Sequence, residues 1–332
     1  ILVIGVAVFV LAAVMWPRIR VWHEPIEWYP EDEPIRVAFR TIDAHMGGAS
    51  QLTLLVQPKG ERGLKDLKVL QGLEKLEADI LGYHDPDIDR LLAGNAVSIL
   101  DVVRETRRAL HDGKEEYYSL PDTQAELNDI LFVFENASPQ QLRRMTTLDL
   151  TLTHMTFTVQ WLPAGSYGPM TEFIDASIEK HLTGLAKVQP TGIVYMFYLT
   201  INQLLGDLIR SFASAFVVIS ILMIFILGEF KLGVISMVPN LLPIGMLLGF
   251  MGFVGIPMDL ATVLVASLAL GLCVDDTIHF LHHFKVEFRR TGDKDRAIDS
   301  SLQCSGRAIV ITSLVLIATT SLYPTAILKN MD

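Results

Sequence analysis

Cysteine is scarce in this chain, with 2 among 332 residues. Cys273 and Cys304 both lie in or beside long apolar runs, and the polar part of the chain contains none. Two such residues cannot form the disulfide framework of a small secreted domain. The polar part therefore gives no information about the redox compartment.

An excess of positive charge is also absent. The net charge is −10, and residues 17–207 hold 18 Lys and Arg against 28 Asp and Glu, so the whole acidic excess lies in that block. Such a block argues against a nucleic-acid partner and would be repelled by anionic lipid headgroups. The composition is 51% hydrophobic, which is high for a soluble protein and low for one made of membrane helices alone.

Clusters of metal-binding or catalytic residues are nearly absent as well. His279, His282 and His283 have the H-x-x-H-H form of a di-iron histidine box, but the other six histidines are scattered singly. One box cannot fill a two-metal coordination sphere, so we expect no metal and no cofactor. Asp275 and Asp276 are neighbours on one helix and point about 100° apart. An intramembrane aspartyl protease needs two facing aspartates from different helices, so we expect no enzyme of that class.

Long apolar runs are present, and they indicate a membrane protein with an α-helical transmembrane bundle and an α+β domain. We expect a first membrane helix over residues 1–16, a polar α+β domain over 17–207 and a membrane bundle over 208–332. The bundle has predicted spans at 208–227, 232–254, 260–284 and 308–323. Because the chain begins with Ile1 inside an apolar run, we expect it to be part of a longer protein.

The polar block shows a strand-helix-strand pattern twice, near residues 51–100 and 153–197. Strands are predicted at 51–57, 96–100, 155–161 and 192–197, and helices at 64–81 and 168–187. Further helices follow Ala96–Leu100 and Pro121, with a break at Ser138-Pro139. The pattern predicts two related βαβ lobes with helices inserted between them.

The span that begins at Leu260 has an unusual feature. Its uninterrupted apolar part ends at Val274 after about 22 Å of helix, whereas a bilayer core is roughly 30 Å thick. The helix must therefore continue through Asp275 and Asp276, which places two carboxylates within the hydrocarbon. A second interpretation is that the helix stops at Val274 and the acids cap its end in the headgroups.

Helical spacing arranges polar groups around these acids. Ser267, Gly271, Asp275, His279 and His283 recur every four residues and form one stripe, with Gly271 able to admit a neighbouring helix. The stripe is typical of a proton path from mid-membrane to one surface. His282 and His283 fit a position in the headgroups equally well.

Other spans contribute supporting residues. Pro239 and Pro243 interrupt the hydrogen bonds of the 232–254 span and free carbonyl groups. Thr312 and Ser313 in the last span fit either helix packing or the proton path. Asp259 fits a helix cap.

The charged segment 285–307 is rich in Lys and Arg, so the positive-inside rule makes it cytoplasmic. Counting spans backwards from this segment puts the turn at Gly228 in the cytoplasm. The large polar block then lies outside.

The run Met237-Val238-Pro239-Asn240-Leu241-Leu242-Pro243, together with Asp275-Asp276-Thr277-Ile278-His279-Phe280, resembles the resistance-nodulation-division (RND) superfamily. The match is to its hydrophobe/amphiphile, hopanoid- and sterol-transporter-like branch, related to the MMPL and Patched/Niemann-Pick proteins. The shared parts are the P-N-x-x-P helix, the G-x-x-x-D-D helix and a large domain between the first two spans. This resemblance implies a porter-type periplasmic domain, a location in the bacterial inner membrane, and one half of a two-half protein, with D-D-T-I-H closer to the C-terminal half.

By the same resemblance, Asp275 and Asp276 are proton-relay acids, and their basic partner comes from the other half. We then expect a transporter, driven by the proton-motive force, that moves hydrophobic sterol- or hopanoid-like lipid towards the periplasm. A periplasmic carrier would receive the lipid, and the protein could form a homo-oligomer. Two alternatives stay open: a lipid-binding sensor or scaffold that does not pump, and a drug-efflux or protein-translocation accessory protein.

Overall fold

The computed structural model describes residues 9–10, 12–15, 18–19, 24–85, 90–91, 93–162, 166–256 and 258–321. The chain divides into two compact units. The sheet unit comprises Asp32–Thr200, and the membrane unit comprises Ile1–Glu31 with Ile201–Asp332. Each unit is described by itself.

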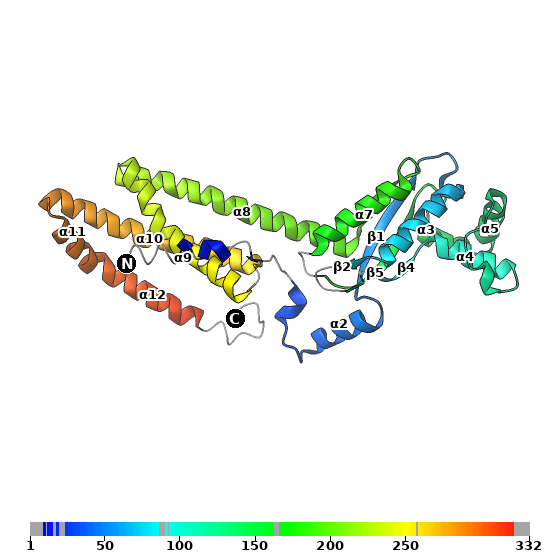
Figure 1. Cartoon of the computed structure of the whole chain (residues 1–332), viewed down its shortest axis with the longest axis horizontal. Coiled ribbons are helices and arrows are strands. Elements are labelled where there is room, and N and C mark those ends of the chain that lie inside the picture. Colours follow the sequence, from blue (N-terminus) through cyan, green and yellow to red (C-terminus); the bar gives the residue numbers. More distant parts are fainter. Residues whose placement is uncertain are drawn as a thin grey trace. The chain divides into compact units, whose positions relative to one another are not determined.

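The sheet unit is built on one four-stranded sheet with the order β4-β5-β1-β6. Its strands are β1 (Ser50–Pro58), β4 (Ala93–Val97), β5 (Thr153–Val159) and β6 (Ala186–Thr191). All neighbouring pairs are antiparallel, so β1 runs parallel to β4 with β5 between them, and β5 runs parallel to β6 with β1 between them. The structure thus contains two strand-helix-strand units, as predicted, but their strands are interleaved in one sheet and do not form two lobes (Figure 1).

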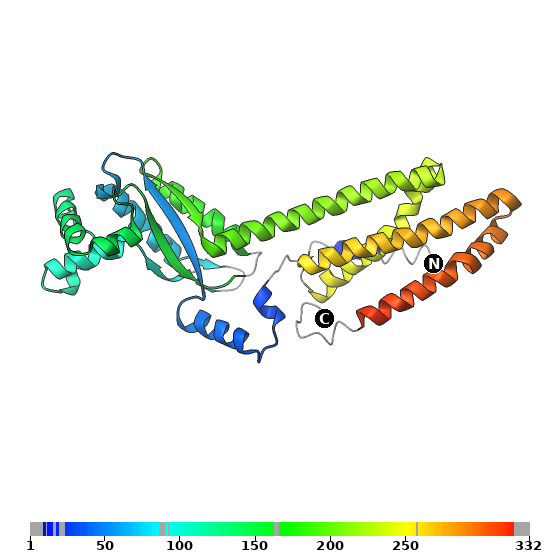
Figure 2. The same cartoon turned by 180° about the vertical axis from the view of Figure 1, so that it is seen from behind.

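Two helices cover one face of this sheet. Helix α3 (Leu67–Leu81) connects β1 to β4, and α7 (Tyr167–Leu182) connects β5 to β6. Strand β5 alternates buried and half-buried residues, which is the pattern of a sheet with one covered face. Figure 2 shows the face that these helices leave open. The buried side chains of β1 and β5 form the core with α3 and α7: Leu52, Leu54, Val56, Met155, Phe157, Val159, Leu70, Leu73, Met170 and Ile174.

The helices inserted between β4 and β5 agree with the predicted pattern. Ser98 caps α4 (Ile99–Leu110) through a capping box with Asp101, and the predicted break at Pro139 separates α5 (Gln124–Ala137) from α6 (Pro139–Met145). The other labelled elements that precede β5 are η2 (Pro25–Trp28), α2 (Pro34–His45), η3 (Gly63–Lys65), β2 (His84–Asp85), β3 (Arg90–Leu91) and η4 (Glu115–Tyr117).

The strand predicted at residues 192–197 is wrong. The strand is β6, one segment earlier, and Gly192 begins the helix α8 (Gly192–Leu227) with a φ of +90°. The run Ile193-Val194-Tyr195 is apolar and contains two β-branched residues, so its pattern alone does not separate a strand from a buried helix. The predicted helix 168–187 ends earlier, at Leu182, because β6 begins at Ala186.

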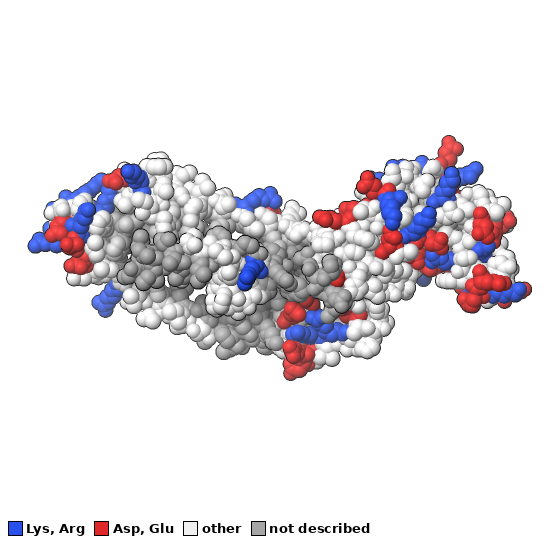
Figure 3. Space-filling model, viewed as in Figure 1, with Lys and Arg blue, Asp and Glu red and all other residues white. Residues whose placement is uncertain are grey.

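Among the described residues, four helices are long and apolar enough to cross a membrane, and they give the chain the character of a membrane protein. From residue 192 onwards the helical elements are α8, α9 (Phe230–Val254), α10 (Leu260–Thr291), α11 (Lys294–Ser301), the π-helical turn η6 (Leu302–Gly306) and α12 (Arg307–Thr320). On the face shown in Figure 3, the charged side chains of the membrane unit gather at the end where α10 meets α11, and the surface along its helices is mostly uncharged.

The structure extends two of the predicted spans. Helix α8 begins sixteen residues before the predicted start at 208, and α10 continues past residue 284 to Thr291. In the charged segment 285–307, the end of α10 is followed by α11 and η6. Residues 9–10 and 12–15 of the first predicted span are helical; the rest of that span, and residues 322–323 of the last, lie outside the described residues.

Candidate functional site

The two acids lie within an unbroken helix. Asp259 caps α10 through a capping box with Thr262, and Gly292 ends the helix in the left-handed conformation with a φ of +70°. The 32 residues of α10 measure about 48 Å at 1.5 Å per residue, more than a bilayer core needs. Asp259 is therefore the predicted cap, and the interpretation in which the helix stops at Val274 is wrong.

Asp275 occupies a face of α10 that the described residues leave uncovered. Its carboxylate lies 3.6 Å from Nε2 of His279, one helical turn later, and the two side chains are 70% and 68% exposed. A Cβ added to Gly271, one turn earlier on the same face, would meet nothing within 4 Å in the described part of the chain. In the part of the predicted stripe from Gly271 to His279, the described residues thus leave Gly271 and the side chains of Asp275 and His279 largely uncovered.

Asp276 points to a different face and lines an apolar pocket of about 420 Å³. Hydrocarbon side chains form most of its wall, and the carboxylate is the one charged group among the described residues that line it. The pocket lies between α9, α10 and α12. Its lining residues are Leu232, Ile235, Ser236, Pro239, Asp276, Thr277, Phe280, Leu281 and Ile309.

A hydrogen bond joins the two motif helices beside this pocket. The Thr277 hydroxyl lies 2.6 Å from Oδ1 of Asn240 and 2.8 Å from the carbonyl oxygen of Cys273 on its own helix. The Asn240 side chain is 1% exposed, and its Nδ2 donates to the carbonyl of Ser236 at 3.2 Å. Asn240 lies between the two prolines of α9, so this bond ties the P-N-x-x-P segment to the residue after Asp276.

The prolines themselves lie inside α9 without ending it. Both prolines are exposed, and Pro239 also lines the pocket. Neither has a backbone N–H, so the carbonyls of Ile235 and Pro239 lose their usual i+4 donors. The two carbonyls that the prolines were predicted to free therefore belong to Ile235 and Pro239, which line the pocket together with Asp276.

The two hydroxyl residues predicted on the last span lie beyond the pocket. Thr312 and Ser313 are both exposed, and the Thr312 hydroxyl donates to the carbonyl of Ile309 in its own helix at 3.0 Å. Ile309, one turn earlier, is the α12 residue that lines the pocket. The structure brings neither hydroxyl into a recorded contact with the acids, so their part in a proton path stays a prediction.

A π-helical turn lies beside the histidine of the stripe. Ser305 in η6 is 5% exposed, and its hydroxyl lies 3.4 Å from the carbonyl oxygen of His279. Single π turns inside α-helices occur frequently at functional sites. The sequence predicted neither this turn nor the Asn240–Thr277 bond, although Asn240 belongs to the P-N-x-x-P motif and Thr277 to the D-D-T-I-H motif.

Close helix packing occurs in α9 rather than at Gly271. A Cβ on Gly249 would lie 2.1 Å from the Cβ of Ala12, and one on Gly252 would lie 2.4 Å from the carbonyl oxygen of Met15. Gly245 meets Phe9 in the same way. The spacing of these glycines is the small-residue signature of tightly packed membrane helices, a signal that the sequence offered.

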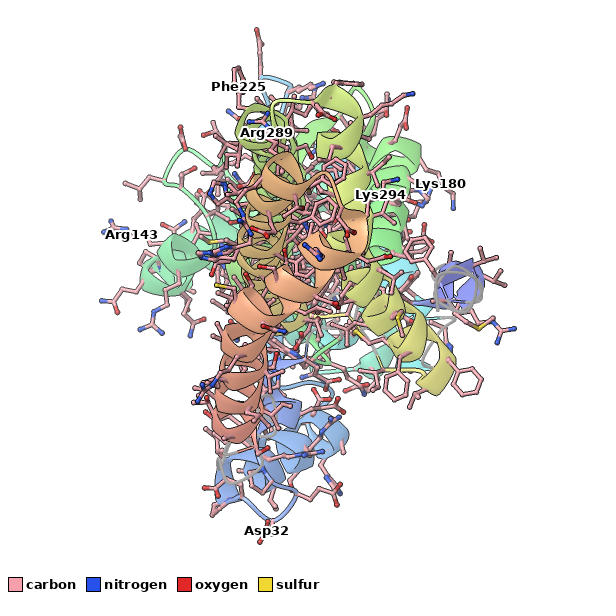
Figure 4. The ribbon with its side chains drawn as sticks, turned by 90° about the vertical axis from the view of Figure 1, so that its left-hand side faces the viewer. Asp32, Arg143, Lys180, Phe225, Arg289 and Lys294 are labelled. Atoms are coloured by element: carbon pink, nitrogen blue, oxygen red, sulfur yellow. The ribbon has the colours of Figure 1, made fainter. Side chains whose placement is uncertain are left out.

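Lys285, in the C-terminal part of α10, contacts the end of α8. The Lys285 ammonium donates a hydrogen bond to the carbonyl oxygen of Leu227, the last residue of α8. This contact places the turn at Gly228 beside the segment that follows residue 284, as expected if both lie on one side of a membrane. Arg289 and Lys294, labelled in Figure 4, come from the last turn of α10 and the first turn of α11.

The sheet unit contains two charge clusters that connect helices. Arg104 of α4 binds Glu77 at 3.1 Å and Glu74 at 3.0 Å, and burial raises the pKa of the Glu77 carboxyl while Arg104 counters part of that rise. The His181 ring lies 2.9 Å from Asp79 and, with Lys180, holds the pKa of that carboxyl below its usual range. Both clusters link helices, and none of their residues lines the pocket that contains Asp276.

Across the described residues, no group of three or more His, Cys, Asp or Glu side chains is arranged to hold a metal ion. His282 and His283 stack edge to face with ring centroids 6.2 Å apart, and both are exposed. Carboxyl groups such as those of Asp275 and Asp276 can take up and release protons.

No protein-family model matches the chain. It is 24% identical over 304 residues to the protein of Methanocaldococcus jannaschii named "Putative membrane protein MJ1562". The alignment covers 86% of this chain and 70% of that relative. The four apolar helices and this likeness support a membrane location for the chain.

Proposed function

We propose that this chain is one half of a proton-driven membrane transporter for hydrophobic, lipid-like substrates. The observation that carries the proposal is the position of Asp275 and Asp276 in the unbroken helix α10, with Asp276 in an otherwise apolar pocket. An ionised acid at the centre of a membrane helix costs about 2.5–3.5 kcal/mol. Such acids are used mainly where protons or ions move through the membrane.

The mechanism follows from the charge of the acids. Water from the outer side supplies a proton to the carboxylate pair, which becomes neutral and packs more easily among apolar side chains. Release of the proton to the cytoplasmic side restores the charge. The difference in packing between the two states shifts the membrane helices, and the outer sheet unit would open and close around the lipid.

The exposure of Asp275 supports a two-half assembly. Its side chain and that of His279 face away from the described helices at 70% and 68% exposure. Facing lipid with a charged group is unfavourable, so a second half of the protein would cover this face and supply the basic partner. A homo-oligomer, a periplasmic carrier and a bacterial inner-membrane location belong to the same proposal.

A sensor that binds lipid without pumping is the second candidate, because the apolar pocket of about 420 Å³ could by itself hold part of a lipid. Proton coupling separates the two functions. A sensor would bind lipid and move no protons, whereas a transporter would lose coupled movement once the acids can no longer ionise.

The test uses the full-length protein in vesicles of phosphatidylethanolamine and phosphatidylglycerol that contain a pH-sensitive dye, with dehydroergosterol as the lipid probe. We expect an imposed pH gradient to drive probe movement together with proton flux. Asp275→Asn and Asp276→Asn should abolish both, while Asp299→Asn, which changes an exposed acid of α11, should leave both intact. Full coupled transport by the double Asn variant would end the proposal, and probe binding without any proton flux in the unaltered protein would favour the sensor.

A further inference from the structure

The two prolines of α9 remove the usual helical donors of two carbonyl groups. In an α-helix the N–H of residue i donates to the carbonyl of residue i−4, and proline has no N–H. The carbonyl of Ile235 therefore lacks its i+4 donor at Pro239, and the carbonyl of Pro239 lacks its donor at Pro243, although the helix continues through both to Val254. In a membrane, such acceptors need a partner from a neighbouring group.

Both of these residues line the pocket that contains Asp276. Ile235 and Pro239 contribute to its wall from α9, and the acid contributes from α10. The 2.6 Å bond from Thr277 to Asn240 fixes the two helices against each other at this level. The residues that carry these carbonyls and the residue that carries the acid thus line one pocket. Thr277, which follows the acid, and Asn240, which follows the first proline, hold the two helices in register.

We propose that the carbonyl oxygens of Ile235 and Pro239 accept the hydrogen bond of the Asp276 carboxyl when that acid is protonated. A neutral carboxyl has an O–H that donates, whereas a carboxylate only accepts. The ionised acid cannot bond these carbonyls and is repelled by their oxygen dipoles. The P-N-x-x-P segment would then hold α10 in the protonated state and release it in the ionised state. This inference rests on the proton-driven function proposed above.

Few other charges act on Asp276 within the described residues. On its own helix the neighbouring titratable groups are Asp275, His279 and Cys273. The residues that line the pocket from α9 are Leu232, Ile235, Ser236 and Pro239, and the residue that lines it from α12 is Ile309. None of them is charged. Ser236 donates its hydroxyl proton to the carbonyl of Gly233 at 2.6 Å, so it has no proton left to donate to the acid. The proposed acceptors from α9 are the two carbonyls that the prolines deprive of their helical donors.

The test gives the two carbonyls their helical donors back. Pro239→Ala restores an N–H for Ile235, and Pro243→Ala restores one for Pro239, while alanine favours the helix. The titration of Asp276 is followed in the full-length protein by infrared spectroscopy of its carboxyl band, in an Asp275→Asn background so that one acid of the pair remains. Asp276→Asn identifies the band.

We expect the double Pro→Ala variant to bind the proton of Asp276 roughly tenfold more weakly, as for the loss of one hydrogen bond, and to show the carboxyl band of a less strongly bonded acid. Leu242→Ala, a change between the prolines that leaves both carbonyls free, should change neither quantity. An unchanged midpoint and band in the double Pro→Ala variant would overturn the inference while Asp276 still titrates. If the unaltered protein showed no titrating Asp276 band at any pH, the proton-driven function itself would fail.

Discussion

The hydroxyl of Thr277 and the side-chain amide of Asn240 are joined at 2.6 Å across α10 and α9. Each residue stands next to the group that defines its motif, Asp276 in one helix and Pro239 in the other. Both ends of the amide are hydrogen-bonded, because Nδ2 donates to the carbonyl of Ser236 within α9 and Oδ1 accepts from Thr277. The acid-bearing helix is therefore fixed to the proline-bearing helix at the level of the acids.

This bond predicts a difference between two substitutions of Thr277. Thr277→Val keeps the shape but leaves the buried Oδ1 of Asn240 without a donor, which should cost about 1–3 kcal/mol. Thr277→Ser keeps the hydroxyl and should cost less. Thermal unfolding of the detergent-solubilised protein measures both. The double variant Asn240→Leu with Thr277→Val should be less destabilised than the sum of the single changes, and strict additivity would show that the bond contributes nothing.

The sequence predicted that α10 continues past Val274 because the thickness of a bilayer sets the minimum length of a helix that crosses it. Fifteen apolar residues are too few to cross a bilayer, so the helix had to continue through Asp275 and Asp276. The same reasoning could not find the Asn240–Thr277 bond, because residues 37 positions apart meet only through the angle at which two helices cross. It also could not choose between one sheet and two lobes, since strand order depends on pairing between distant segments.

The strand predicted at 192–197 failed for a different reason. A short apolar run with β-branched residues fits a strand or a buried helix, and the continuation into Leu208–Leu227 decides for the helix. The expectation that Gly271 admits a neighbouring helix stays a prediction, and among the described residues the close contacts occur at the glycines of α9. Spacing shows that a small residue could be approached and does not show which helix approaches it.

The packing of α9 predicts that Gly249 tolerates no side chain. Its Cβ position lies 2.1 Å from the Cβ of Ala12 and 2.4 Å from the Cα of the same residue, so a larger residue must push the two helices apart. Gly249→Val should destabilise the detergent-solubilised protein by about 1–3 kcal/mol. Gly60→Val is the matched control, because a Cβ there meets nothing within 4 Å and the site lies outside the membrane helices. Equal thermal stability of the Gly249 and Gly60 variants would contradict this packing.

The Asp79–His181 contact predicts a loss of stability in acid. His181 donates to the carboxylate, and Lys180 adds to the effect at 3.4 Å, so the pKa of Asp79 lies below its usual range in the folded chain. A carboxyl whose pKa is lowered in the folded chain stabilises the fold at pH values above its ordinary pKa. That contribution is lost as the pH falls through the folded pKa, below about pH 4.

Hydrogen exchange of the α3 and α7 peptides in the full-length protein, followed from neutral to acidic pH, measures this loss. His181→Phe keeps a ring of similar size and removes the donor, so it should weaken protection at neutral pH and flatten the acid-dependent decline. Lys180→Ala removes a group whose side chain is 66% exposed and should change the profile less. An unchanged profile in His181→Phe would show that this contact does not hold the two helices together.

Two arginines of α4 should differ sharply in their contribution to stability. Arg104 pairs with Glu77, whose side chain is 10% exposed, whereas Arg108 pairs at the surface with Glu105 and Glu115. Burial raises the pKa of Glu77, so its ionised form weakens the fold as the pH rises through that pKa, and Arg104 offsets the effect.

Arg104→Leu should therefore cost about 3–5 kcal/mol at neutral pH and less in mild acid, where Glu77 takes up a proton. Arg108→Leu should cost at most about 1 kcal/mol with no such pH dependence. Unfolding at neutral and mildly acidic pH distinguishes the two, and Glu77→Gln in the Arg104→Leu background should restore most of the loss because it removes the unpaired buried charge.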